Sequence, residues 1–133
     1  MSAGAESTFH RAMLAALRGA TDVGGAINGV FDGPATKASA PYAELGSLIA
    51  SDWGTKDRAG RELRTLVMLR DRAEAPARLY ALAAAADAAI TAIDATLGDW
   101  RIASLVLVRS QIVGDRPGEW TAVIEHRVRL LAA

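Results

Sequence analysis

A long β-hairpin between Pro41 and Arg72 is the strongest pattern in the chain. Its second half, Arg61 to Arg70, alternates two sets of side chains with the period of a strand: Leu63, Thr65, Val67 and Leu69 against Glu62, Arg64, Leu66 and Met68. Its first half, Tyr42 to Ser51, has few charges and a weaker pattern. The loop between the halves, Asp52 to Gly60, exceeds a two-residue turn, so we expect it to project as an arm and not to close tightly.

Two segments have helical periodicity. Glu6 to Arg18 places Phe9, Met13, Leu14 and Leu17 on one side, which predicts an amphipathic helix of about three turns. A longer helix is predicted from Pro76, a residue suited to the first helical turn, to its end at Gly98. Its apolar stripe consists of Leu79, Leu82, Ala83, Ala86, Ile90, Ile93 and Leu97. The opposite face of this helix is expected to carry Asp87 and Asp94.

A second hairpin follows the long helix. Trp120 to Leu130 has the clearest alternation in the chain, Arg101 to Val113 is apolar on both faces at its centre, and Gly114 to Gly118 forms a moderately long turn between them. A very short strand is also expected at Val30 to Asp32. The sequence therefore predicts an α+β fold: one antiparallel sheet of about four strands, with the long helix and the N-terminal helix packed against it, in a single domain over residues 1–133.

The two faces of this sheet suggest an interface between copies of the chain. The predicted helices can cover only one face of the sheet, yet the middle strands carry apolar side chains on both faces. We therefore expect a homo-oligomer, with Val106 and Val108 as interface candidates and Leu105 and Leu107 as the contrasting pair. An alternative stays open, in which the N-terminal helix covers the second face.

Composition excludes several classes of protein. Fifteen basic and fifteen acidic residues cancel, so no long-range field draws nucleic acid or an anionic membrane to the surface. The absence of cysteine excludes disulfides and thiolate chemistry. The longest uncharged apolar run, Leu79 to Ala86, is too short to span a bilayer. We expect a protein of the cytoplasm, or of a particle assembled there, with neither DNA binding as its main role nor a membrane partner.

Side chains that carry chemistry are sparse. The chain has two histidines: His10 on the first helix, and His126 in the apolar row of the last strand, where a packed or interfacial role is expected. Asp87 and Asp94 are interpreted as a solvated helix face. No serine-nucleophile motif and no glycine-rich phosphate loop occurs. We therefore predict no catalytic, cofactor-binding or metal-binding residues, no cofactor and no enzymatic activity.

The arm offers the best candidates for recognition. Trp53 lies beside Lys56, Arg58 and Arg61, a set that either stacks a nucleobase or anchors a loop or protein interface. We favour the interface, because basic residues gather on the hairpin whereas acidic ones dominate the long helix and its end. Opposite charges on different elements suit head-to-tail contacts between identical neighbours.

Several motifs resemble those of a known family. They are Asp32-Gly33-Pro34-Ala35, Ala40-Pro41-Tyr42 with Leu45-Gly46, and Asp52-Trp53-Gly54-Thr55-Lys56 with Gly60-Arg61-Glu62. These residues, and the order of the elements, are similar to the tail completion or tail terminator proteins of long-tailed phages and of gene transfer agents. The resemblance covers nearly the whole chain.

The resemblance implies a structural subunit and no enzyme or cofactor. Such subunits form a hexameric ring on the head-proximal end of the tail tube, stop its growth and offer a surface to the head connector. The implied partners are further copies of the chain, the tube protein and the head-side connector or stopper, with DNA passing through the ring without specific binding. The implied location is the virion, assembled in the bacterial cytoplasm. Two alternatives remain: a head-side stopper ring of the same particle, and a small non-enzymatic α+β binding domain.

Overall fold

One sheet joins both hairpins in the computed structural model, which describes residues 4–133. The elements are α1 (Ala5–Gly19), β1 (Val30–Phe31), β2 (Tyr42–Asp52), β3 (Gly60–Arg72), α2 (Ala77–Thr91), β4 (Thr96–Leu97), β5 (Trp100–Arg116) and β6 (Glu119–Ala132). The strand order is β1-β2-β3-β6-β5-β4. The predicted α+β class is confirmed, but the sheet has six strands within the described residues and is mixed, since β1 pairs parallel with β2.

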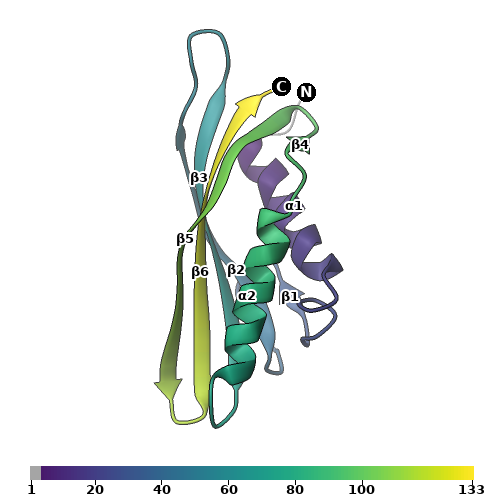
Figure 1. Cartoon of the computed structure of the whole chain (residues 1–133), viewed down its shortest axis with the longest axis vertical. Helices are drawn as coiled ribbons and strands as arrows, with labels where there is room; N and C mark the ends of the chain where they lie inside the picture. The colour runs from purple at the N-terminus through teal and green to yellow at the C-terminus, as the bar shows by residue number, and fades with distance from the viewer. Residues whose placement is uncertain (1–3) are drawn as a thin grey trace.

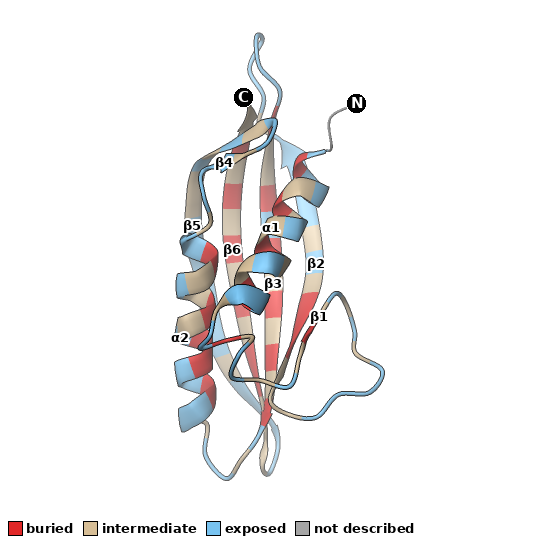
Figure 2. Ribbon diagram, turned by 90° about the vertical axis from the view of Figure 1, so that its right-hand side faces the viewer, coloured by how far each residue is buried: buried red, intermediate tan, exposed pale blue. Residues whose placement is uncertain are grey.

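The long strands β3 and β6 form the centre of the sheet, as their alternation predicts. Val67 lies opposite Ile124 and Leu63 lies opposite Val128, and all four are buried. A strand places successive side chains on opposite faces, so every second residue of both strands points to the same core. Figure 2 shows these buried positions as bands along β3 and β6 beneath the helices.

Both helices cover the same face of the sheet (Figures 1 and 2). From α1, Phe9, Met13 and Leu17 are buried, and α2 adds Leu79 and Ile90 to the same core. Full burial of a side chain of this size stabilises the fold by about 1.5–3 kcal/mol before entropy is counted. The alternative in which the N-terminal helix covers the second face is wrong, and that face has no helix within residues 4–133. We call it the open face.

The long helix is shorter than predicted. It ends at Thr91 and not at Gly98, because the Asp94 carboxylate accepts a hydrogen bond from the Thr96 N–H at 3.0 Å and turns the chain into β4. Gly98 then adopts a φ of 59°, which favours glycine, and leads into β5. Asp87 and Asp94 therefore do not share a helix face.

The turn of the second hairpin is also shorter than predicted. The strands continue to Arg116 and from Glu119, so that only Pro117 and Gly118 lie between them. Gly118 has a φ of 79°, a conformation that glycine adopts without strain.

The loop between β2 and β3 projects beyond the end of the sheet as an arm (Figure 1). The Trp53 N–H donates to the Gly60 carbonyl at 3.1 Å, and the Thr55 N–H donates to the Arg58 carbonyl at 2.8 Å. The expectation that the loop does not close tightly is wrong at the tip of the arm. There the hydrogen bond between Thr55 and Arg58 encloses only two residues. A side chain at Gly60 is excluded, since its Cβ atom falls 2.6 Å from the Trp53 carbonyl oxygen.

Candidate interaction surfaces

The open face of the sheet is organised by shared carboxylates. Three glutamates each lie between two arginines: Glu62 between Arg127 and Arg129, Glu125 between Arg64 and Arg109, and Glu119 between Arg72 and Arg116. We call these the Arg–Glu–Arg groups. Each group carries one positive charge more than it carries negative charges. The face therefore presents mixed charges, most of them already paired within the subunit.

The three groups differ in how closely their atoms approach. Glu125 accepts from Arg64 Nη1 at 3.1 Å and from Arg109 Nε at 3.0 Å. These two hydrogen bonds hold the pKa of the Glu125 carboxyl below its ordinary value. Glu62 is more distant, since its Oε1 lies 3.7 Å from Arg127 Nε and 3.8 Å from Arg129 Nε.

Apolar side chains on the open face are interleaved with these charges. Leu66 and Met68 of β3 are half-buried, and Met68 lies opposite Val123 of β6. They cover Gly46 of β2, where an added Cβ atom would lie 3.0 Å from Leu66 Cβ. The predicted apolar surface is therefore present in part, as a narrow strip crossed by arginines.

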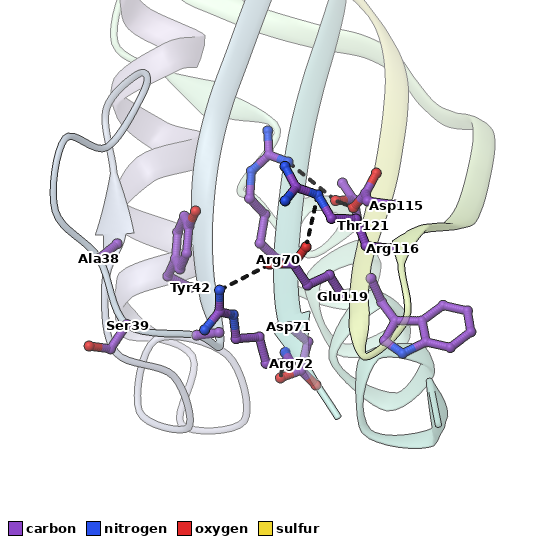
Figure 3. A pocket seen from close by; sticks show the side chains of 12 residues that line it. Ala38, Ser39, Tyr42, Arg70, Asp71, Arg72, Asp115, Arg116, Glu119 and Thr121 are labelled. Atoms are coloured by element: carbon purple, nitrogen blue, oxygen red, sulfur yellow. Dashed lines mark hydrogen bonds and ion pairs between the residues drawn. The ribbon is translucent and has the colours of Figure 1, made fainter. Parts of the chain in front are cut away.

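A recess of about 640 Å³ lies at the end of the sheet opposite the arm (Figure 3). In it Arg70 donates from Nη1 to Thr121 Oγ1 at 3.2 Å, and Thr121 Oγ1 donates to Asp115 Oδ2 at 2.6 Å. Arg70 Nε also donates to Glu44 Oε1 at 2.6 Å. These polar groups bind one another, so none of them is poised as a free acid, base or nucleophile.

Glu44 is the most enclosed charge near this recess. Burial alone raises the pKa of the Glu44 carboxyl, but hydrogen bonds from Arg70 and from the Ala35 N–H, which lies 2.7 Å from Oε2, outweigh burial and lower it. Glu44 thus ties the loop after β1 to the sheet in its ionised form.

Trp53 lies at the base of the arm, where the Arg129 guanidinium stands 5.4 Å from the centroid of its ring. This is a cation–π contact between the arm and β6. The structure therefore favours an anchoring role for Trp53 over a free platform for a nucleobase.

The remaining predicted residues fall in two separate places. Lys56 and Arg58 are exposed at the tip of the arm, and Arg61 lies at its base, donating from Nη1 to the Gly60 carbonyl at 2.8 Å. Val106 and Val108 lie on β5, at the other side of the sheet. The structure thus brings the arm residues together but does not bring them to the valines.

Buried and exposed side chains do not alternate regularly along β5. Leu105 packs against the core as expected, but Leu107 is exposed together with Val106 and Val108. A bulge between Leu107 and Arg109 explains the exposure of Val108, because a bulge inserts a residue and breaks the alternation of faces.

One pair of residues was missed by sequence reasoning. His126 is buried, which confirms its packed position, and its Nε2 atom lies 2.7 Å from Asp87 Oδ1 of α2. Asp87 is therefore half-buried and not part of a solvated face. The signal available was a histidine in an apolar strand row, which requires a polar partner.

This contact takes one acidic residue, Asp87, out of the predicted head-to-tail pairing. Within α2, Asp87 is the sole acidic residue, and His126 occupies it. Asp94 lies beyond the helix end. Asp94 and Asp99 remain exposed just after the helix, so the pairing of a basic hairpin with acidic residues of the next subunit stays a prediction.

Within residues 4–133, no three histidine or carboxylate side chains gather as a metal site requires. Neither α1 nor α2 has the length and apolar character of a helix that crosses a membrane.

Comparison with known proteins decides the family. The family model described as tail completion protein gp17 matches residues 11–130. The chain belongs to this family. No curated protein matches it. As a tail completion protein, the chain is a structural protein of a phage-type tail and not an enzyme. The resemblance seen in the sequence is thereby confirmed.

A solved structure shares the fold of this tail completion protein. The matching chain belongs to a structure described as the virion of a native gene transfer agent particle. The superposition has a TM-score of 0.63 at 19% sequence identity and covers 96% of this chain and 95% of that chain. The arrangement of two helices on one face of a curled sheet is therefore found in a component of such a particle.

Proposed function

We propose that the chain is the subunit of a hexameric ring that ends the tail tube and joins it to the head connector. The observation that carries this proposal is the family match, which spans residues 11–130. We place the whole chain, residues 1–133, in one domain. The ring takes its position in the virion at the junction of head and tail, after assembly in the bacterial cytoplasm.

The surfaces of the subunit support a role in assembly. The recess near Arg70 holds polar groups that already bind one another, as expected for a structural part and not for a reaction centre. The arm extends Lys56 and Arg58 away from the sheet, where they reach a neighbour or the tube. An extended arm buries little in its own subunit, so its contacts are available to a partner.

The charges of the open face support a ring that does not bind DNA specifically. Each Arg–Glu–Arg group pairs a carboxylate with its arginines, which weakens the attraction to phosphate that free arginines exert. If this face lines the channel of the ring, DNA can pass through the channel without specific binding.

The mass of the protein in solution tests the proposal, measured by light scattering with and without purified tail tube protein from the same particle. We expect a ring-sized species in at least one of the two conditions, and electron micrographs in which a ring closes one end of each tube. A protein that stays monomeric or dimeric in both conditions and leaves tube ends open contradicts the proposal. A ring that binds the head connector and ignores the tube indicates a head-side stopper.

A further inference from the structure

Both outer edges of the sheet are open over part of their length. β1 pairs with β2 only at Ala43 and Glu44, and β4 pairs with β5 only at Trp100 and Arg101. Within residues 4–133, no other strand pairs with the outer edge of β2 or of β5. An open edge presents main-chain N–H and C=O groups that can pair with a further strand.

The open segments lie at the same height on the two edges. One row of paired residues crosses the sheet from Ile49 through Arg64 and Arg127 to Val106. The neighbouring rows follow the same pairing. Leu48 of β2 lies level with Leu107 of β5, Ala50 with Leu105, and Ser51 with Ser104. Segments 48–51 and 104–107 therefore face outward at matching levels, and neither contains a bulge.

Exposed apolar side chains concentrate at these segments. Ile49 is 64% exposed, Val106 39%, Leu107 42% and the adjacent Val108 42%. Neither segment contains a charged residue or a proline, which are the residues that commonly protect an open edge from pairing. The two edges are thus uncovered and unprotected at the same level of the sheet.

Strand direction determines how two copies fit together. β2, β3, β6 and β5 are antiparallel neighbours, so β2 and β5 run in opposite directions. A second copy rotated about an axis along the strands brings its β2 beside β5 of the first, again antiparallel. This contact uses two different edges, so it repeats from copy to copy and forms a ring when the rotation between copies closes.

We infer that segment 104–107 of one copy pairs with segment 48–51 of the next, so that one sheet continues around the ring. This inference rests on the proposed function and specifies the contact between subunits. Ile49 of one copy then lies beside Val106 of its neighbour, as a cross-strand apolar pair flanked by arginines. The bulky helices fit the outer side of such a ring, and the open face lines its inner side.

Engineered cysteines test this contact, because the chain has no cysteine of its own. In the double variant Ile49→Cys with Val106→Cys, the two cysteines of one copy stand three strand spacings apart, about 14 Å, so they cannot bond within a subunit. Mild oxidation is expected to give a ladder of covalent oligomers up to the size of the ring. Each single variant is expected to stay uncrosslinked. A second double variant, Ile49→Cys with Ser104→Cys, allows for a shift of two residues in register.

The matched control is Ile49→Cys with Val113→Cys. Val113 is also exposed on β5, but it lies level with Thr121 and Arg70, well below the row of Ile49. We expect no ladder from this pair. Dimers from Val106→Cys alone indicate a two-fold contact between β5 edges and overturn the inference.

The same samples separate this inference from the proposed function. Protein of ring mass that gives no ladder with either Ser104→Cys or Val106→Cys as the partner of Ile49→Cys overturns the edge contact and leaves the ring intact. Protein that stays monomeric with and without tube protein contradicts the ring itself.

Discussion

His126 on β6 and Asp87 on α2 stand 2.7 Å apart between His126 Nε2 and Asp87 Oδ1, in a position where the histidine has no exposed surface. Because an ionised carboxylate can only accept, the Nε2–H of His126 donates this hydrogen bond, which satisfies one polar atom of a buried side chain. This contact fixes the helix on the sheet at one height. It also shows that α2 is held by a polar bond as well as by its apolar stripe.

Replacing Asp87 with alanine is expected to destabilise the fold by about 1–3 kcal/mol, because it leaves the buried imidazole without this partner. The melting temperature should fall by several degrees in differential scanning calorimetry. Asp57→Ala is the control, since Asp57 is exposed in the arm. Equal melting temperatures for the two variants would mean that the contact contributes nothing to stability.

Glu44 predicts a dependence of stability on pH. The pKa of its carboxyl is lowered in the folded protein, so ionised Glu44 stabilises the fold above the pKa of the unfolded chain. This contribution should be lost progressively as the pH falls below about 4.5 and through the folded value. Glu125, whose pKa is also lowered, should act in the same direction.

Urea unfolding at pH 7 and in the acid range measures this effect. Glu44→Gln should lower stability at pH 7 and reduce the loss of stability on acidification. Glu74→Gln, at an exposed position, is the control and should follow the unmodified protein. A Glu44→Gln curve parallel to that of the unmodified protein would exclude Glu44 as a source of the acid sensitivity.

Val106 and Leu105 are adjacent in sequence, yet we expect an aspartate at each position to have a different effect. Val106 is exposed, so Val106→Asp should change the stability of the monomer by no more than about 0.5 kcal/mol. Leu105 packs against the core, and Leu105→Asp should cost on the order of 2–3 kcal/mol, because it places a charge among apolar side chains. In a subunit that forms rings, Val106→Asp should prevent association while the fold remains. Thermal unfolding and light scattering together measure both effects, and equal loss of folding in the two variants would argue against an interface at Val106.

The sequence predicted the parts of the fold that depend on local periodicity. The alternation of β3 and β6 and the apolar side of α1 correspond directly to the buried residues. The end of α2 was wrong for a physical reason: Ile93 and Leu97 still pack against the core, so the apolar stripe continues after the backbone has left the helix. Periodicity reports which side chains are buried, whereas the turn at Asp94 decides where the helix ends.

The interaction surfaces were harder to predict because they depend on pairing between distant strands. Arg64 meets Glu125 only through the register of β3 with β6, which no local pattern determines. The contact of His126 with Asp87 likewise requires the placement of α2 on the sheet. By contrast, the arm was recognisable from its length and composition, and its projection is confirmed.

The arm makes few contacts with the rest of its subunit, and this allows a selective deletion. Trp53 and Ala59 are kept, because Trp53 contacts Arg129 and the Ala59 carbonyl accepts from the Ala132 N–H at 2.9 Å. Replacing residues 54–58 with Asn-Gly should then leave the melting temperature nearly unchanged, since all the removed residues are exposed. Assembly should fail instead, because Lys56 and Arg58 can no longer reach a neighbour or the tube. Electron microscopy of particles made with this variant should show tails of irregular length or heads without tails. Normal tails joined to filled heads would show that the tip of the arm is an ordinary surface loop, and the ring proposal would then depend on the sheet edges and the family match alone.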